Sequence, residues 1–181
     1  LWEMDNISRG AKDADLDPLI NAVKEVALFE DRAIYEGFPE GHIKGLVKSS
    51  GSGSISMPDD LNEFLKVIGA QISELTSDGV EGPYALIVND RKWKSLTSLT
   101  EGYPVLKQIE EVTGGRVIVN REIDHSFLIS ERGGDYELVI GQDLSLGYDA
   151  HNTEKVKLYL TESFTFRVLT PEAIRVLTPK K

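Results

Sequence analysis

Residues 155–168 read Lys-Val-Lys-Leu-Tyr-Leu-Thr-Glu-Ser-Phe-Thr-Phe-Arg-Val, with apolar side chains at every second position on either side of Thr161-Glu162-Ser163. Val156, Leu158 and Leu160 would share one face of an extended chain. Phe164, Phe166 and Val168 would do the same further on. The stretch therefore predicts two β-strands, 156–161 and 164–169, and each needs a cover for one face.

A long amphipathic helix near the start of the chain is the best candidate for that cover. Asp17 followed by Pro18 favours a helix start, and apolar residues then recur at helical spacing until Gly37 and Pro39. We expect one helix over 18–36, about 28 Å long at 1.5 Å per residue. It would pack across a C-terminal sheet.

The middle of the chain mixes helical and extended patterns. Pro58, Asp59 and Asp60 precede an apolar stripe that ends at Asp78-Gly79, which predicts a second helix. Further helices are expected at 91–99 and 104–112, strands at 84–89, 116–120, 126–130 and 136–141, and a tight turn at 132–135. The Gly- and Ser-rich stretch 48–56 is typical of a mobile surface turn or a short irregular hairpin. Together these patterns predict an α+β protein with a helix-and-strand subdomain inserted between the long helix and the C-terminal strands.

Composition excludes several classes of function. The chain has 181 residues, 30 acidic and 20 basic, with a formal charge of -10, so nucleic-acid and membrane phosphates would be repelled. It has no cysteine, which removes disulfides and thiolate chemistry. No apolar run approaches the roughly 20 residues that span a bilayer. We therefore expect a cytoplasmic protein that binds neither nucleic acid nor membrane.

Catalytic and metal-binding patterns are missing from the sequence. His42, His125 and His151 stand far apart and form no metal-binding pair, so we expect no metal site. Asp124-His125-Ser126 contains the residue types of a hydrolase triad, but alternation along a strand would turn His125 to the opposite face.

Two tryptophans call for separate interpretations. Trp93 is most simply a core residue. Trp2 lies in the stretch 1–5, which we interpret as strand-like. Its indole would pack in a core or subunit interface, or would stack on a flat ligand.

Several phrases of the sequence, taken together and in order, resemble one family of shell proteins. They are Leu-Trp-Glu-Met-Asp-Asn at 1–6, Asp-Gly-Val-Glu-Gly-Pro-Tyr at 78–84, Ser-Glu-Arg-Gly-Gly-Asp at 130–135, Gly-Gln-Asp-Leu-Ser-Leu-Gly-Tyr at 141–148, and Thr-Glu-Ser-Phe-Thr-Phe at 161–166 running into Pro-Glu-Ala at 171–173. The family is that of the type 1 encapsulin nanocompartment shell proteins, also called linocin- or maritimacin-like. Its members carry an N-terminal helix and a long extended loop upstream of the first phrase, so we expect the resemblance to cover only their C-terminal two thirds.

The resemblance implies a fold and a function. The fold is the tailed-phage major-capsid-protein fold, with a peripheral domain at 1–46 that holds the spine helix, an axial domain at 47–124, and a β-rich C-terminal part of the peripheral domain at 125–181. The function is that of a structural shell subunit without enzymatic activity. Many copies would form a closed icosahedral compartment around cargo enzymes, such as a ferritin-like iron oxidase or a peroxidase, in support of iron storage or oxidative-stress protection. A protease or bacteriocin-like hydrolase is the alternative, because such labels have been attached to the family.

The resemblance also implies three local roles. A loop that lines a five-fold pore would comprise Thr97, Ser98, Leu99, Thr100, Glu101, Gly102 and Tyr103, and a ring of Glu101 carboxylates could attract cations. A groove for the C-terminal targeting peptides of cargo proteins would comprise Asp143, Leu144, Leu146 and Tyr148. No cofactor is required, but Trp2 matches a position where some members stack a flavin.

Overall fold

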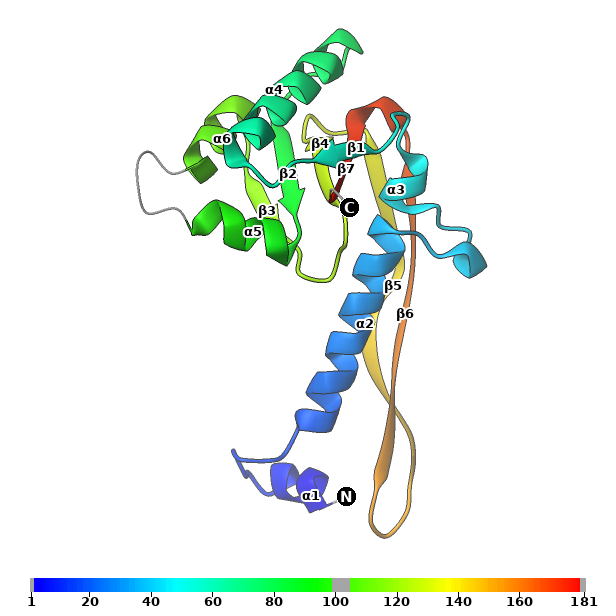
Figure 1. The fold of residues 1–181 in the computed structure, drawn as a ribbon. Coiled ribbons are helices and arrows are strands. Elements are labelled where there is room, and N and C mark those ends of the chain that lie inside the picture. The colour runs from blue at the N-terminus through cyan, green and yellow to red at the C-terminus, as the bar shows by residue number, and fades with distance from the viewer. Residues whose placement is uncertain (1, 99–104, 180–181) are drawn as a thin grey trace. The chain divides into compact units, whose positions relative to one another are not determined.

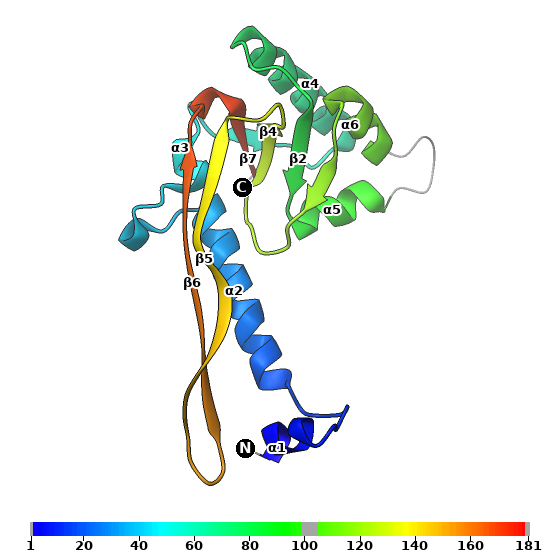
Figure 2. The same ribbon diagram turned by 180° about the vertical axis from the view of Figure 1, so that it is seen from behind.

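The structure is a computed structural model that describes residues 2–98 and 105–179. The chain folds into two compact units. Unit 1 comprises residues 1–31 and 138–165, and unit 2 comprises residues 32–137 and 166–181. Figures 1 and 2 show the elements from opposite sides.

Unit 1 is built from helices and a long two-stranded ribbon. It contains α1 (Trp2–Ser8), most of α2 (Asp17–Tyr35), and most of the paired strands β5 (Tyr136–His151) and β6 (Val156–Val168). In both views α2 runs alongside the ribbon. Phe29 of α2 meets Phe164 of β6 edge to face, with ring centroids 6.4 Å apart. The helix predicted at 18–36 is thus confirmed within a residue at each end.

The ribbon is longer than the sequence pattern predicts. Strand β6 runs without a break where two strands were expected, and β5 continues ten residues past Gly141, to His151. Thr161, Glu162 and Ser163 interrupt the apolar pattern but not the backbone, because Thr and Ser tolerate extended conformations when a partner strand supplies the hydrogen bonds. Gly141 lies against Ser163 of that partner strand.

Unit 2 is organised around a five-stranded mixed sheet of order β1-β7-β4-β2-β3. The strands are β1 (Ile55–Met57), β7 (Ile174–Pro179), β4 (Ser126–Ser130), β2 (Tyr84–Val88) and β3 (Val117–Val119). The outer pairs β1–β7 and β2–β3 are parallel, and the inner pairs β7–β4 and β4–β2 are antiparallel. Leu86 of the inner strand β2 pairs with Leu128 on one side and Val117 on the other.

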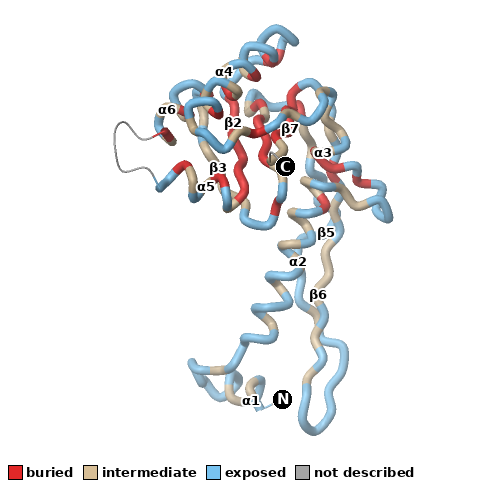
Figure 3. The backbone as a smooth tube through the Cα atoms, viewed as in Figure 1, coloured by how far each residue is buried: buried red, intermediate tan, exposed pale blue. Residues whose placement is uncertain are grey.

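Three helices pack on this sheet, and the described residues of the unit also form one short helix and two 3-10 turns. They are α4 (Leu61–Ser77), α5 (Asp90–Thr97), α6 (Val105–Thr113), α3 (Gly45–Ser49), and the 3-10 turns η1 (Pro39–Gly41) and η2 (Pro171–Ala173). Phe64, Ile68 and Leu75 of α4 are fully buried in a core shared with the sheet. Figure 3 shows buried residues gathered in this unit, whereas α1 and the far part of the ribbon are exposed.

Strand β7 was not predicted, and it corrects the expected arrangement of the C-terminal strands. Strands β4 and β7 pair with each other and join the sheet of β1, β2 and β3, whereas β5 and β6 form a separate two-stranded sheet. A single C-terminal sheet beneath the long helix is therefore wrong. The two compact units meet at other residues than the predicted domain boundaries. The boundaries at residues 46 and 124 are not tested by this division and stay predictions.

The Gly- and Ser-rich stretch is held in place, contrary to the expectation of a mobile turn. Ser50 Oγ and Ser52 Oγ both donate to the carbonyl oxygen of Ile174, at 3.1 and 3.2 Å. The backbone N–H of Gly51 donates to the carbonyl of Pro171 at 3.0 Å. These bonds fasten the stretch to the start of β7.

Candidate functional site

The ribbon of unit 1 has two unlike faces. Because side chains alternate along a strand, Leu158 and Leu160 point to the same side as Phe164, which contacts α2. Tyr159 lies between Leu158 and Leu160, so its side chain points to the opposite face of the ribbon, away from α2. There its ring covers Gly147, where an added Cβ would lie only 2.2 Å from Tyr159 Cζ. The ion pair between Lys157 Nζ and Asp149 Oδ2, at 2.6 Å, lies on this same polar side.

The apolar face of β5 carries three of the four residues expected to form a peptide groove. Leu144, Leu146 and Tyr148 flank Gly147 on alternate positions and so point to the side of α2. Their exposed fractions are 38%, 52% and 57%. The strand therefore presents a row of open apolar side chains that can receive an apolar segment from another molecule.

Asp143 does not share this face. Alternation turns it to the polar side of the ribbon, where its Oδ1 accepts a hydrogen bond from the backbone N–H of Leu144 at 2.8 Å. Ser145 Oγ donates to the Asp143 carbonyl at 2.9 Å. The carboxylate is thus engaged locally rather than presented among the leucines.

Carboxylates border the region where α2 meets the ribbon. Burial raises the pKa of Glu30, and the charges of Glu162, Asp31 and Asp143 add to the rise in that order. Within residues 2–98 and 105–179, no group of three or more histidine or carboxylate side chains is arranged to hold a metal ion. These four carboxylates therefore make the region where α2 meets the ribbon negatively charged, beside the exposed apolar side chains of β5.

Trp2 lies on a helix, so its interpretation as strand-like is wrong. The helix α1 has only seven residues, too few to show a helical period, but Glu3 and Asp5 in its first turn suit a helix N-terminus. Trp2 is 74% exposed, and Met4 and Ile7 are exposed as well. A flat partner could reach the indole from solvent.

The described part of the predicted pore segment lies where α5 ends. Thr97 Oγ1 donates to the Trp93 carbonyl at 3.0 Å, and Ser98 Oγ donates to the Ser95 carbonyl at 3.1 Å. Both residues are exposed. The other members of the segment, Leu99, Thr100, Glu101, Gly102 and Tyr103, lie outside the described residues.

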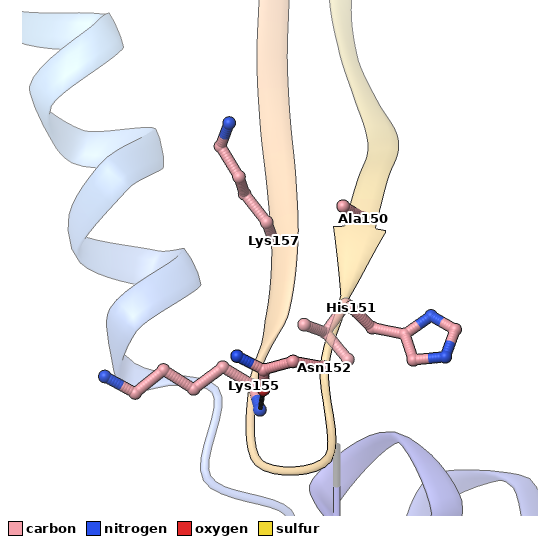
Figure 4. A pocket seen from close by; sticks show the side chains of 6 residues that line it. Ala150, His151, Asn152, Lys155 and Lys157 are labelled. Carbon is pink, nitrogen blue, oxygen red and sulfur yellow. Dashed lines mark hydrogen bonds between the residues drawn. The ribbon is translucent and has the colours of Figure 1, made fainter.

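An open hollow of about 530 Å³ lies at the tip of the ribbon, lined by Ala150, His151, Asn152, Lys155, Val156 and Lys157. Figure 4 shows that its polar side chains diverge, with His151 on one side and Lys155 on the other. The hydroxyl of Tyr148 hydrogen-bonds His151 Nδ1. Because the groups do not converge, the hollow lacks the geometry of a catalytic or metal site.

The residues of the hydrolase alternative are equally unsuited to catalysis. Ser126 Oγ and His125 Nδ1 are buried, and neither has a hydrogen-bond partner within the described part of the chain. A serine nucleophile needs a hydrogen-bonded base, and that base needs a group to orient it.

Sequence reasoning missed several residues of the apolar face. Leu138, Ile140 and Phe29 are exposed apolar side chains of the same unit. Leu138 and Ile140 keep the alternation of β5, so a pattern search extended through Gly141 would have included them.

No described helix combines the length and apolar composition needed to cross a membrane.

Solved structures with a similar fold are shells of viruses and related particles. A virus-like particle from Pyrococcus furiosus is 21% identical, with a TM-score of 0.68 over 96% of this chain and 71% of that chain. The capsid of an empty GTA particle is 13% identical, with a TM-score of 0.66 over 95% and 68%. A structure of Mycobacterium phage Che8 is 12% identical, with a TM-score of 0.63 over 96% and 66%. The fold is thus that of capsid-type shell proteins, and the predicted tailed-phage capsid fold is confirmed.

Sequence similarity then identifies the family. The Linocin_M18 family model, described as "Encapsulating protein for peroxidase", matches residues 1–165. The chain belongs to this family, the encapsulins, as its sequence phrases predicted.

Named relatives support the same assignment. The type 1 encapsulin shell protein of Rhodospirillum rubrum is 43% identical over 94% of this chain, and that of Rhodococcus erythropolis is 41% identical over 94%. The chain spans 62% and 65% of the lengths of these two relatives. A ferritin-like-encapsulin shell fusion protein of Pyrococcus furiosus is 25% identical over 74% of this chain and 39% of its own length.

Proposed function

We propose that this protein is a structural shell subunit, many copies of which close into an icosahedral compartment in the cytoplasm around cargo enzymes. The observation that carries the proposal is the 43% identity to a type 1 encapsulin shell protein along 94% of the chain. The exposed large apolar side chains of unit 1 support it, because a protein that has partners carries such side chains where a partner covers them. The chemistry of the compartment is then that of its cargo.

The cargo we propose is a ferritin-like iron oxidase or a peroxidase. The family description names a peroxidase, and one relative is fused to a ferritin-like domain. Either cargo fits a role in iron storage or in protection from oxidative stress.

Targeting peptides at the C-terminus of the cargo would dock on the apolar face of the ribbon. Leu144, Leu146 and Tyr148 would supply the apolar contacts in a row two residues apart, which matches the side-chain period of an extended peptide. Asp143 lies on the other face and would act at most on the edge of the groove.

Two further roles rest on the resemblance alone. The segment from Thr97 to Tyr103 would line a pore at the five-fold axis, with Glu101 attracting cations.

Trp2 would stack a flavin. A yellow purified particle that loses its colour in Trp2→Ala, but keeps it in the same-helix control Met4→Ala, would support the second role. A colourless particle from the unaltered protein would contradict it.

Particle mass is the measurement that tests the shell function. Light scattering with negative-stain imaging should be applied to residues 1–181 and to the longest natural form of the protein. Closed particles of many copies from either preparation are the expected result. A monodisperse monomer, which for residues 1–181 has a mass of 20.1 kDa, from both preparations would contradict the proposal.

The hydrolase alternative has its own test. Substitution of His125 and Ser126 by alanine should leave any hydrolysis rate of the purified protein unchanged. A rate that falls with either substitution would instead favour the enzyme.

A further inference from the structure

A small pocket in unit 2 lies between the end of β1 and helix α5. It has a volume of about 140 Å³ and is lined by Met57, Asp59, Arg91, Lys92, Ser95 and Pro179. At about 30 Å³ per water molecule, this space holds four or five waters. The pocket is therefore the size of a small ion with part of its hydration shell.

Lys92 is the unusual residue of this pocket, because it is a buried cation that forms no ion pair with a carboxylate of residues 2–98 or 105–179. It is 4% exposed. Its Nζ donates to the carbonyl oxygen of Pro58 at 2.7 Å and lies 4.4 Å from the ring centroid of Phe64. An ammonium group has three N–H donors, so these two partners leave donor capacity for a third.

The charge on Lys92 is poorly compensated. Burial lowers its pKa, and Arg91 acts in the same direction, whereas Asp59 and Asp60 act against it. A buried cation of this kind gains when an anion is brought next to it. The pKa direction agrees with the geometry, in which Lys92 lines the pocket and its ammonium lies against the Pro58 carbonyl and the Phe64 ring.

Arg91 adds a second cation at the mouth of the pocket. Its Nη2 lies 3.3 Å from Asp59 Oδ1, and both side chains are largely exposed. An exposed pair of this kind is weak, and a guanidinium has five donors, so Arg91 can contact an anion without losing Asp59. The pocket thus carries two cations against one carboxylate in a chain whose formal charge is -10.

We propose that this pocket binds a small tetrahedral oxyanion, of which inorganic phosphate is the example. The ammonium of Lys92 is the buried charged partner, the guanidinium of Arg91 is the exposed one, and the hydroxyl of Ser95 is a neutral donor on the next turn of the same helix. Every lining residue belongs to unit 2, so the binding needs no residue of unit 1.

Calorimetric titration with inorganic phosphate at constant ionic strength tests the proposal on the purified protein. Saturable binding is expected. Ser95→Ala should weaken binding several-fold, and Arg91→Gln should weaken it about tenfold, because hydrogen bonds to charged groups are the stronger ones. Lys94→Gln is the matched control, since Lys94 lies on the same helix and pairs with Asp90 instead.

Lys92→Met is the decisive variant, and circular dichroism shows whether it is folded. The folded variant should lose phosphate binding altogether. Absence of heat with the unaltered protein would overturn the proposal. So would equal effects of phosphate and chloride, or equal losses in Lys94→Gln and Arg91→Gln. If Lys92→Met does not fold, the comparison of Arg91→Gln and Ser95→Ala with Lys94→Gln decides the matter.

Discussion

Arg175 on β7 donates from Nη2 to Asp78 Oδ2 at 2.6 Å, although 97 residues separate the two in sequence. Arg175 is 3% exposed, whereas Asp78, just after the end of α4, is half exposed. Arg175 Nη1 also donates to the Glu172 carbonyl at 2.8 Å. This one guanidinium therefore connects the last strand of the sheet to the helix that covers it.

Removal of the Asp78 carboxylate should destabilise unit 2. Asp78→Asn leaves the buried guanidinium without its charged partner, and we expect a loss of about 1–3 kcal/mol, because one partner is exposed to solvent and Glu74 lies 4.0 Å away. Urea unfolding followed by circular dichroism measures the change. Asp59→Asn, at an exposed pair, should cost less than about 1 kcal/mol. Equal losses in the two variants would refute this account of Arg175.

Acid should weaken the turn between β4 and β5 through Asp135. A hydrogen bond from Arg132 holds the pKa of Asp135 below its ordinary value, so the unfolded chain takes up the proton first. The stabilisation is complete above the ordinary Asp pKa of about 3.9 and is lost as the pH falls through the lower folded value. Asp135→Asn should therefore be less stable than the parent at neutral pH, and the difference should shrink in acid. A difference that does not depend on pH would contradict this mechanism.

The effect of Glu30 on stability should change with pH in the opposite direction to that of Asp135. Its pKa is raised by burial and by Glu162, so its ionised form disfavours the folded state above that pKa. Glu30→Gln should raise the melting temperature at neutral pH and leave it unchanged in acid, where the carboxyl group is protonated in both states. Glu25→Gln, an exposed change on the same helix, should have no such effect. A Glu30→Gln variant that melts lower than the parent at neutral pH would show that the carboxylate stabilises the fold.

Charge on the apolar face of the ribbon should abolish cargo capture. Leu146→Asp places a carboxylate in the row of Leu144 and Tyr148, yet Leu146 is about half exposed, so the fold should tolerate it. The measurement is co-purification of a cargo protein that carries its C-terminal tail. Tyr159→Asp, equally exposed but on the polar face, is the control and should keep its cargo. Loss of cargo from the control alone would place the groove on the other face.

His42 should be replaceable by glycine with a gain in stability. Its φ of 58° lies in the left-handed region, and among the described residues it is the only non-glycine residue with a positive φ. His42→Gly should stabilise unit 2 by about 0.5–1 kcal/mol, the cost of the left-handed conformation less the added entropy of the unfolded chain. His42→Ala should give no gain in urea unfolding, because alanine keeps the Cβ.

The elements that the sequence predicted best are those with a local signal. Helix α4 begins at Leu61, directly after the expected Pro58-Asp59-Asp60, and the side chain of Asp60 caps it by accepting from the backbone N–H of Glu63 at 2.9 Å. Strand β2 is buried throughout, as its apolar run indicated. In such cases a capping residue or the spacing of apolar residues determines the element, and both can be recognised within a few positions of the sequence.

The elements that were missed depend on distant partners. Strand β7 contains Arg175 and ends at Pro179, so its local composition argues against a buried strand, and the charged partner of the arginine, Asp78, lies 97 residues away in sequence. In the candidate site, the alternation of Leu144, Leu146 and Tyr148 was legible in the sequence. The position of Asp143 on the opposite face became clear only when β5 proved to be one continuous strand.

The order of the sheet has a consequence for folding during synthesis. Strand β1 is paired with β7 alone within the described residues, and β7 also pairs with β4. On the ribosome, β1 emerges more than a hundred residues before its only neighbour, so it must wait, unpaired, while β2, β3 and β4 associate. Completion of the core is thus coupled to the synthesis of β7. The surface built on this sheet stays unfinished until β7 has been made and has paired with β1 and β4.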